Sequence, residues 1–442
     1  MTQAQADRML KQAHTHLIRF HALEDTPPIL SRGIGARVWD VEGNEYIDFV
    51  SGQICATIGH NHPRITEAIQ ASCQKMIHSN NYMLHDDSIV LAEKLAALLP
   101  DSLGTLIFKS TGSEANEVAL AMAKVATGRH EVIGPQRSFF GTTASCRAAT
   151  YSYGHQGHGP GMPGNYVIPA PYSYRCPIEH CKGTCDTTCL DVGFSLFDAQ
   201  TEGYGAAVIV EPIFSAGGLV DPPKAWFERL AEKTRERGML LVLDESQTAP
   251  ARLGAMFGFQ ELGIVPDILT FSKCIGGGIP LSAVATSAEI EQRCFDRRFI
   301  MGSSHTNDPL PCRVGIAVLE VLVEEQLAER ARTMGAYMRQ RLLALAQRHE
   351  IIGEIRGRGL LQGMELVRDR ETKEPAEEEG AVFSDACLER GLIANIVRMK
   401  GQNSVIRMAP PLTIAKDELD HGLEIMDEAL GLASDAMAKY RR

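Results

Sequence analysis

Four short runs rich in Val, Ile and Leu alternate with helical patterns through the middle of this 442-residue chain, at residues 105–109, 206–211, 239–244 and 268–272. Apolar runs of this length are typical of strands buried on both faces. Their alternation with helices indicates a largely parallel sheet wrapped by helices. The sequence therefore predicts an α/β fold built on a large, mostly parallel-sheet domain.

The regions on either side of the sheet have different patterns. Residues 37–49 alternate apolar and polar side chains, which predicts a hairpin turned at residues 42–44. A long helix is expected from about Leu310 toward His349, followed by a glycine-broken strand pair and a helical tail. We expect three parts: a large domain at 64–320, a smaller α+β domain at 321–442, and an N-terminal segment, 1–63, that contributes to the smaller one.

Composition narrows the choice of partners. The net charge is -11 and the pI is about 5.7, which argues against nucleic acid or an anionic membrane as a main partner. The first twenty residues resemble neither a signal peptide nor a transit peptide, and no apolar run approaches the ~20 residues of a membrane helix. Most of the 11 cysteines are scattered through apolar segments, so a cytoplasmic location is expected.

Polar groups follow three of the predicted strands at their carboxyl ends, where ligands bind in open α/β sheets. Asp244 ends one run, Lys273 follows another, and the motif STGS at 110–113 follows a third and opens a helical pattern. The motif suits a phosphate, because glycine allows close approach and a helix start presents unpaired N–H groups. Alternatively, Thr111 is only a helix cap with Glu114 in the first turn.

Lys273 and Asp244 complete a set of three functional groups. A desolvated lysine is a competent nucleophile for carbonyls, although a lysine at a strand end can simply reach solvent. Asp244 could merely cap the following turn. An aldehyde cofactor with a phosphate and a basic ring nitrogen needs an amine, an anion seat and a carboxylate together. Their joint occurrence therefore favours such a cofactor.

At this point four motifs resemble those of the class III aminotransferases, a family of pyridoxal-5′-phosphate (PLP) enzymes of fold type I. They are STGSEANE at 110–117, DESQT at 244–248, SK and its glycine run at 272–278, and RGRG at 356–359. The similarity extends from about Gly33 to the C-terminus. The resemblance implies PLP as cofactor, a small-molecule amino acid and keto acid as substrates, and a homodimer or dimer of dimers with the site at the subunit interface.

The resemblance also implies roles for individual residues. Lys273 would form the Schiff base and move the proton, and Asp244 would pair with the pyridinium nitrogen. The remaining cofactor contacts would come from Thr111, Gly112, Ser113, Asn116, Phe139, Gln247 and, from the partner subunit, Ser304. Relatives usually have His where this chain has Phe140.

Within the family the chain is most similar to the 2,2-dialkylglycine decarboxylase group. Gln53 matches a glutamine placed against the scissile carboxylate, and Arg407 lies in the carboxylate-binding segment VIRMAPPLT. Ala216 stands where that group has a serine and where ω-aminotransferases have a glutamate that pairs with the arginine. Arg407 should therefore stay available for an α-carboxylate. Thr142, beside the aromatic pair, is expected to help shape the substrate pocket.

These residues predict a PLP-dependent aminotransferase for α-amino acids, with a keto-acid acceptor such as pyruvate. The Cα bond perpendicular to the cofactor ring is the one that breaks. Gln53 could hold a carboxylate there, which would couple transamination to decarboxylation. Three alternatives remain: ordinary transamination, a PLP-dependent lyase or epimerase on the same fold, and a non-catalytic homologue.

Metal sites are not expected. Cys176, Cys181, Cys185 and Cys189 depart from the tight Cys-x-x-Cys pairs of common zinc sites, so loop thiols or a redox-labile pair are favoured over zinc. The decarboxylase group also has alkali-metal sites. The matching positions here are Ser79, Asn81, Ser304, Thr306 and Asp308.

Overall fold

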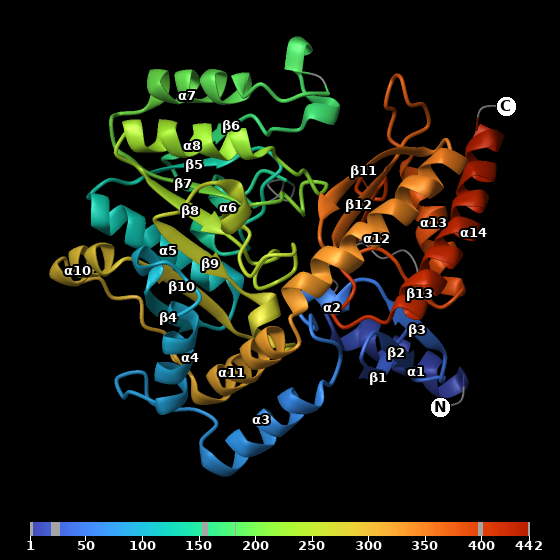
Figure 1. Cartoon of the computed structure of the whole chain (residues 1–442), viewed down its shortest axis with the longest axis horizontal. Helices are drawn as coiled ribbons and strands as arrows, with labels where there is room; N and C mark the ends of the chain where they lie inside the picture. Colours follow the sequence, from blue (N-terminus) through green and yellow to red (C-terminus); the bar gives the residue numbers. More distant parts are fainter. Residues whose placement is uncertain (1–2, 19–26, 153–157, 182, 397–400, 441–442) are drawn as a thin grey trace. The chain divides into compact units, whose positions relative to one another are not determined.

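The computed structural model describes residues 3–18, 27–152, 158–181, 183–396 and 401–440. They fall into two compact units, one formed by residues 63–329 and the other by residues 1–62 together with 330–442. Both units combine helices with sheets (Figure 1). The larger one contains a mostly parallel sheet, which confirms the α/β fold class.

A seven-stranded sheet forms the centre of the larger unit, in the order β4-β10-β9-β8-β7-β5-β6. Its strands are β4 (Thr105–Lys109), β5 (Glu131–Pro135), β6 (Asn165–Ile168), β7 (Gly205–Val210), β8 (Leu240–Asp244), β9 (Ile268–Phe271) and β10 (Ser282–Thr286). The four predicted strands are present, with ends within one residue of those expected. Strand β10 is antiparallel to both neighbours and the other pairings are parallel. Strands β4, β7, β8 and β9 therefore end at the same edge.

Helices cover this sheet. They are α3 (Pro63–Lys75), α4 (Asp86–Ala96), α5 (Gly112–Thr127), α6 (Ala144–Ala149), α7 (Thr188–Gln200), α8 (Lys224–Glu236), α9 (Phe259–Leu262), α10 (Ala288–Asp296) and α11 (Pro309–Glu324), with short 3-10 turns η1 (Asp101–Leu103), η2 (Ser173–Arg175), η3 (Glu179–Cys181) and η4 (Lys273–Gly276). Helix α5 packs on β7 to β10, and its buried face of Ala, Val, Leu and Met joins the core. None of the helices in the described ranges has the length and apolar character of a membrane span.

The smaller unit contains two sheets. The first has the order β1-β2-β3-β13 and the second has the order β11-β12-β14. Its elements are α1 (Gln3–His16), β1 (Leu30–Ile34), β2 (Arg37–Asp40), β3 (Glu45–Asp48), α2 (Ser51–Ile54), β11 (Ile352–Arg358), β12 (Leu361–Leu366), α13 (Glu377–Glu389), β13 (Leu392–Ile393), β14 (Val405–Met408) and α14 (Lys416–Tyr440). Strands β2 and β3 form the predicted hairpin, and β11 pairs antiparallel with β12 as expected.

The single long helix predicted after Leu310 is wrong. The structure has two helices there, α11 and α12 (Leu327–Arg348), separated at Glu325 and Gln326. Gln326 has a positive φ of 51°, which no continuing right-handed helix allows. The break falls where the chain passes from the larger unit to the smaller one.

Candidate active site

The three predicted polar segments meet at the edge of the sheet where β4, β8 and β9 end. The helix after β4 begins at Gly112, and a side-chain Cβ placed there would lie 2.8 Å from Ser272 Oγ and 2.9 Å from Ser246 Oγ. Asn116, one turn further along α5, donates a hydrogen bond of 2.6 Å to Asp244 Oδ2. A larger residue at 112 would push these two hydroxyls aside, so the helix start lies directly against the segments that follow β8 and β9.

Asp244 is a buried acid held by neutral donors. The Asn116 side-chain amide donates to Asp244 and to the Phe140 carbonyl, and the Ser246 backbone N–H donates to Asp244 Oδ1 at 2.8 Å. Thr270 Oγ1 in turn donates to Asn116 Oδ1 at 2.6 Å, which fixes the orientation of the amide. Burial raises the pKa of Asp244, while the nearby Lys273 charge acts in the opposite direction. A cation beside this carboxyl would favour its ionised form.

Lys273 follows β9 and is partly buried. Its φ is +48°, in the left-handed region that non-glycine residues rarely adopt, at a cost of roughly 1–2 kcal/mol. Strained residues of this kind cluster at functional sites, where the surrounding structure holds them. Here Lys273 follows the strand next to the one that Asp244 ends, and its charge partly offsets the burial that raises the pKa of Asp244.

The start of α5 combines a cap with a potential anion seat. Thr111 Oγ1 accepts from the Glu114 backbone N–H, and the Glu114 carboxylate accepts from the Thr111 N–H, so the capping interpretation of Thr111 is correct. Gly112 and Ser113 occupy the next two positions, whose N–H groups have no partner within a helix. Ser113 Oγ accepts from the Thr142 N–H at 3.1 Å, which ties the 141–142 turn to the seat.

The aromatic pair beside this edge divides into two roles. Phe139 is partly exposed, and its backbone N–H donates to Glu211 Oε1 at 2.9 Å. Phe140 is buried in the core cluster, and its carbonyl accepts from Asn116. The Phe140 side chain therefore packs in the core, while its carbonyl helps to fix the Asn116 amide that donates to Asp244.

Sequence reasoning missed Glu211 and Thr270. Glu211 is buried directly after β7, and the rule that identified Asp244, a polar group at a strand end, would have found it. Thr270 is a buried hydroxyl within an otherwise apolar strand, which was also a visible signal.

The other expected residues of the larger unit are less tightly defined. Gln247 is partly exposed after β8, Thr142 and Ser304 are exposed, and Ala216 is buried. Among the described residues, the side chains of Asn116, Ser113 and Thr270 make the hydrogen bonds that connect the segments at this edge of the sheet.

The smaller unit brings together the segments that carry Gln53 and Arg407. Arg407 is buried in β14, and its backbone N–H donates to Asn395 Oδ1. Gln53 is exposed within residues 51–54, where Ser51, Gly52 and Ile54 have φ values of 49°, 64° and 63°. Ser51 Oγ donates to the Ala409 carbonyl at 2.6 Å. The two candidate carboxylate-binding groups thus lie on hydrogen-bonded neighbouring segments.

The turn residues 48–54 have their own anchor. The Asp48 carboxylate accepts from the Val50 and Gly52 N–H groups at 2.8 and 2.7 Å. The same carboxylate lies 2.7 Å from His60 Nε2, which accounts for His60 without a metal.

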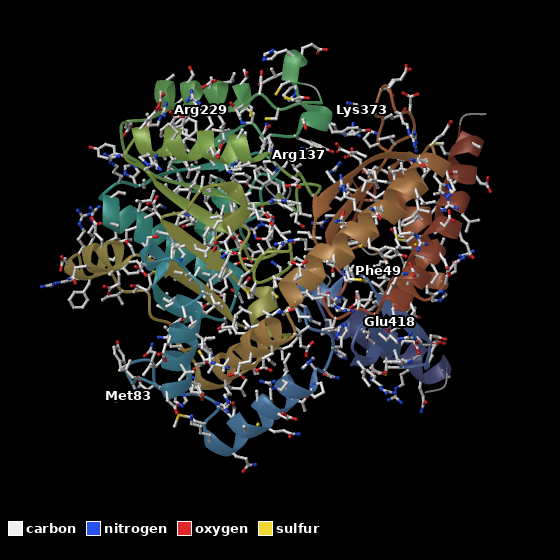
Figure 2. The ribbon with its side chains drawn as sticks, viewed as in Figure 1. Phe49, Met83, Arg137, Arg229, Lys373 and Glu418 are labelled. Atoms are coloured by element: carbon white, nitrogen blue, oxygen red, sulfur yellow. The ribbon has the colours of Figure 1, made fainter. Side chains whose placement is uncertain are left out.

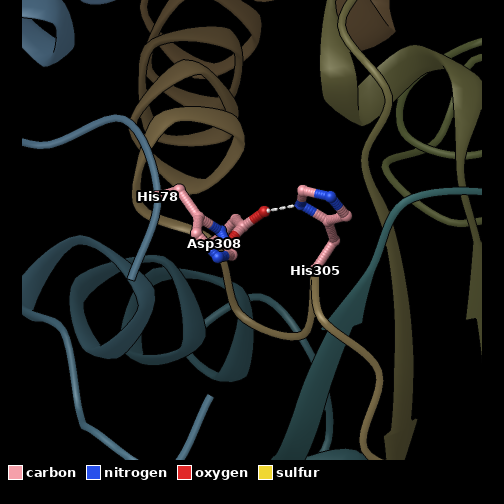
Figure 3. A group of neighbouring side chains, drawn as sticks. All are labelled: His78, His305 and Asp308. Atoms are coloured by element: carbon pink, nitrogen blue, oxygen red, sulfur yellow. Dashed lines mark hydrogen bonds and ion pairs between the residues drawn. The ribbon is translucent and has the colours of Figure 1, made fainter. Parts of the chain in front are cut away.

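Three of the five positions considered for alkali metals, Asn81, Thr306 and Asp308, are engaged by protein groups. The two Asp308 oxygens lie 2.7 Å from His78 Nδ1 and 2.5 Å from His305 Nδ1 (Figure 3). Thr306 Oγ1 accepts from Lys109 Nζ, and Asn81 donates to the Ser303 carbonyl. These separations are those of hydrogen bonds, and they carry no argument for a metal.

Comparison with known proteins identifies the relatives of this chain. The model of the Aminotransferase class-III family matches residues 21–430. An uncharacterized aminotransferase of Schizosaccharomyces pombe is 42% identical over 420 residues, which are 95% of this chain and 94% of the relative. A leucine/methionine racemase of Thermococcus litoralis is 35% identical over 412 residues, covering 91% of this chain and 90% of the relative.

A solved structure links the fold to the cofactor. An amine transaminase from an uncultivated Pseudomonas species, described as PLP-bound, superimposes with a TM-score of 0.85 at 28% identity, covering 95% of this chain and 98% of that one. The residues at the sheet edge fit PLP. Asp244 is a buried acid that needs a cation, Lys273 supplies an amine, and Gly112 leaves room at a helix start for a phosphate.

Proposed function

Because the chain belongs to the class III aminotransferase family and uses PLP, we propose that it is an ordinary α-amino-acid aminotransferase with a keto acid such as pyruvate as acceptor. The single observation that carries this proposal is a buried Arg407 together with Ala216. By the family resemblance, Ala216 stands where ω-aminotransferases carry a glutamate that pairs with the arginine. A guanidinium can bind a carboxylate through two parallel hydrogen bonds.

PLP supplies an electron sink for the bond broken at Cα when it is bound. Asp244 keeps a proton on the ring nitrogen, and Asn116 with Thr270 hold the Asp244 carboxylate in place. The first N–H groups of α5, at Gly112 and Ser113, bind the phosphate. Lys273 would hold and move the proton removed from Cα, the role of a positioned general base and acid.

Substrate selection belongs to Arg407 and Ala216. Arg407 would bind the α-carboxylate of the amino acid. Ala216 has no charge, so this position offers no carboxylate to compete with the substrate for the guanidinium. α-Amino acids are therefore favoured over ω-amines.

Loss of a proton is favoured over loss of CO2. Ala216 lacks the serine hydroxyl that decarboxylating relatives place against the substrate, and Gln53 is exposed on a strained turn. The S. pombe relative is named as an uncharacterized aminotransferase.

A racemase is the second candidate, because a relative at 35% identity is named as a leucine/methionine racemase. Racemisation needs the same proton removal at Cα, followed by its return to the opposite face.

We further propose a homodimer in which Ser304 acts on the partner's cofactor. Ser304 is exposed, and exposed apolar side chains lie nearby in sequence at Ile300 and separately at Tyr82, Met83 and Leu84 (Met83 is labelled in Figure 2). Apolar exposure of this extent is typical of interaction surfaces.

A donor screen tests the function. Purified enzyme with pyruvate receives L- and D-amino acids, 2-aminoisobutyrate and simple amines, and keto acid, alanine, CO2 and inversion of configuration are each scored. The proposal expects keto acid and alanine without CO2. CO2 from 2-aminoisobutyrate would favour the decarboxylating alternative, and inversion without keto acid would favour the racemase.

A further inference from the structure

A cluster of cysteines lies in the larger unit between β6 and α7, apart from the proposed active-site residues. It comprises Cys176, Cys181, Cys185 and Cys189, all with free thiols. Cys176, Cys181 and Cys189 are buried, while Cys185 is partly exposed. The aminotransferase mechanism gives none of them a task.

Cys181 and Cys189 are held by different partners. The Cys181 thiol donates to Asp186 Oδ1 at 3.2 Å, and the Asp186 N–H donates back to its sulfur at 3.4 Å. Burial raises the pKa of Cys181 to about 12. The Cys189 sulfur accepts from Trp226 Nε1 at 3.3 Å, beneath the first turn of α7. Both sulfurs also lie against Cys185, but Cys181 is shared between Cys185 and Asp186.

Cys185 is the accessible and acidic member. Hydrogen bonds from the Cys189 thiol, the Thr187 N–H and the Cys181 thiol, in that order of effect, lower the pKa of Cys185 to about 6. Cys185 lines a surface cavity of about 640 Å³ with Asp186, Glu228, Arg229, Glu232 and Arg235. Arg229, labelled in Figure 2, pairs there with Asp191 and Glu232. A small oxidant can therefore reach the Cys185 sulfur.

Metal binding is the competing use of such a cluster. Within the described ranges, the side-chain groups whose ligand atoms converge are His78 with His305 and Asp308, and His85 with Asp86 and Asp87, and neither includes a cysteine. An exposed thiol of low pKa beside a buried second thiol is instead the arrangement of a cysteine that is oxidised and then resolved.

We propose that Cys185 is a peroxide-reactive thiol that closes a disulfide with Cys189. The Cys185 thiolate attacks one oxygen of the peroxide, the O–O bond breaks, and the departing hydroxide or alkoxide takes up a proton. The resulting sulfenic sulfur is attacked by the Cys189 sulfur, so an S–S bond forms and the S–O bond breaks. The hydroxide leaves with the Cys189 proton as water. In total, two thiols are oxidised and one hydrogen peroxide is reduced to two waters.

Peptide mass spectrometry of the PLP-loaded enzyme tests the assignment. Trypsin cuts after Arg175, Lys182 and Lys224, so Cys185 and Cys189 fall on one peptide while Cys176 and Cys181 fall on another. After hydrogen peroxide treatment and thiol blocking, we expect the first peptide to lose the mass of two hydrogen atoms. A cross-link between the two peptides would contradict the choice of Cys189.

Variants and pH sharpen the test. Relative to a thiol of ordinary pKa, Cys185 should react about tenfold faster near pH 6 and only about twofold faster near pH 7, because the greater thiolate fraction is offset by lower nucleophilicity. The exposed Cys73 provides the comparison. Cys189→Ser should stop the reaction at a sulfenic acid that dimedone traps, Cys185→Ser should abolish the disulfide, and Cys73→Ser should change neither.

Two results would overturn the proposal. One is oxidation of Cys185 no faster than that of Cys73 at pH 6. The other is stoichiometric zinc in the purified protein that is lost in Cys185→Ser, because the cluster would then be a metal site. Quenching of Trp226 fluorescence upon oxidation, measured in Trp39→Phe so that one tryptophan remains, is the supporting optical signal.

Discussion

The edge of the seven-stranded sheet and the Gln53–Arg407 corner of the smaller unit hold their polar groups in different ways. At the edge, Asp244 is buried and fixed through Asn116 and Thr270, all on regular elements. At the corner, Gln53 is exposed on a turn with three left-handed residues, beside the buried Arg407. A fixed, desolvated edge suits one permanent cofactor, whereas the corner suits substrates that enter and leave. Changes at the edge should therefore affect all donors alike, and changes at the corner should select among them.

Asp244→Asn should have the largest effect. It keeps the shape of the side chain but removes the charge that holds a proton on the ring nitrogen, so kcat should fall by about 10²–10³ for every donor. Steady-state kinetics with an amino acid and an amine provides the measurement. A fall in kcat for only one class of donor would show that the sheet edge also takes part in substrate selection.

The same variant gives a pH-dependent stability difference in the cofactor-free protein. The folded pKa of Asp244 is raised by burial, so its contribution to stability is present below the unfolded pKa of about 3.9 and is lost as the pH rises through the folded pKa. Asp244→Asn should therefore gain stability over wild type as the pH increases. Urea unfolding of both cofactor-free proteins across this range tests the sign, and a constant difference would contradict it.

Arg407→Ala should come next. Loss of charge-assisted hydrogen bonds of about 2–3 kcal/mol predicts a fall of roughly 30–150-fold in kcat/KM for α-amino acids, chiefly through KM. Amines should be affected far less. Arg407→Lys keeps the charge without the two-pronged geometry and should recover only part of the loss. An equal fall in kcat/KM for α-amino acids and for amines would show that Arg407 does not recognise the substrate carboxylate.

Asn116→Ala tests the rigidity of the edge. The substitution removes two buried hydrogen bonds, one donated to Asp244 and one accepted from Thr270. The free energy of unfolding should therefore fall by about 1–3 kcal/mol. Asn165→Ala, which loses surface hydrogen bonds to the Met162 and Pro163 carbonyls, should cost about 0.5 kcal/mol or less. Similar costs for the two variants in denaturant unfolding would mean that the network does not hold the edge.

Ala216→Glu should have the smallest effect on overall rate and the clearest effect on selectivity. By the family resemblance, a carboxylate at this position competes with the substrate carboxylate for Arg407, so kcat/KM should rise for amine donors and fall for α-amino acids, roughly by a few-fold each. The ratio of the two kcat/KM values is the quantity to measure. An unchanged ratio would show that residue 216 does not determine the choice between amines and α-amino acids.

The sequence predicted the sheet better than the helices around it. Strands β4, β8 and β9 are continuous apolar runs closed by polar residues, and such runs have few competing structures. The break between α11 and α12 was missed, because residues 323–328 contain neither Gly nor Pro and favour helix throughout.

For the site, the strand-end rule placed Asp244, Lys273 and the 110–113 motif at one edge, as the structure has them. The rule did not reveal that Asn116 forms hydrogen bonds with both Asp244 and Thr270. These residues are far apart in the sequence, and which side chains meet depends on how the helix packs on the sheet.

Covalent attachment of the cofactor to Lys273 is the measurement that tests the central claim most directly. The PLP-loaded protein is reduced with borohydride, digested and analysed by mass spectrometry, with Lys273→Ala as the control. We predict that the cofactor mass is found on Lys273, that trypsin no longer cuts there, and that the visible absorbance of the bound cofactor is lost in the variant. Attachment at another lysine, or an unmodified Lys273 in an active preparation, would contradict the account.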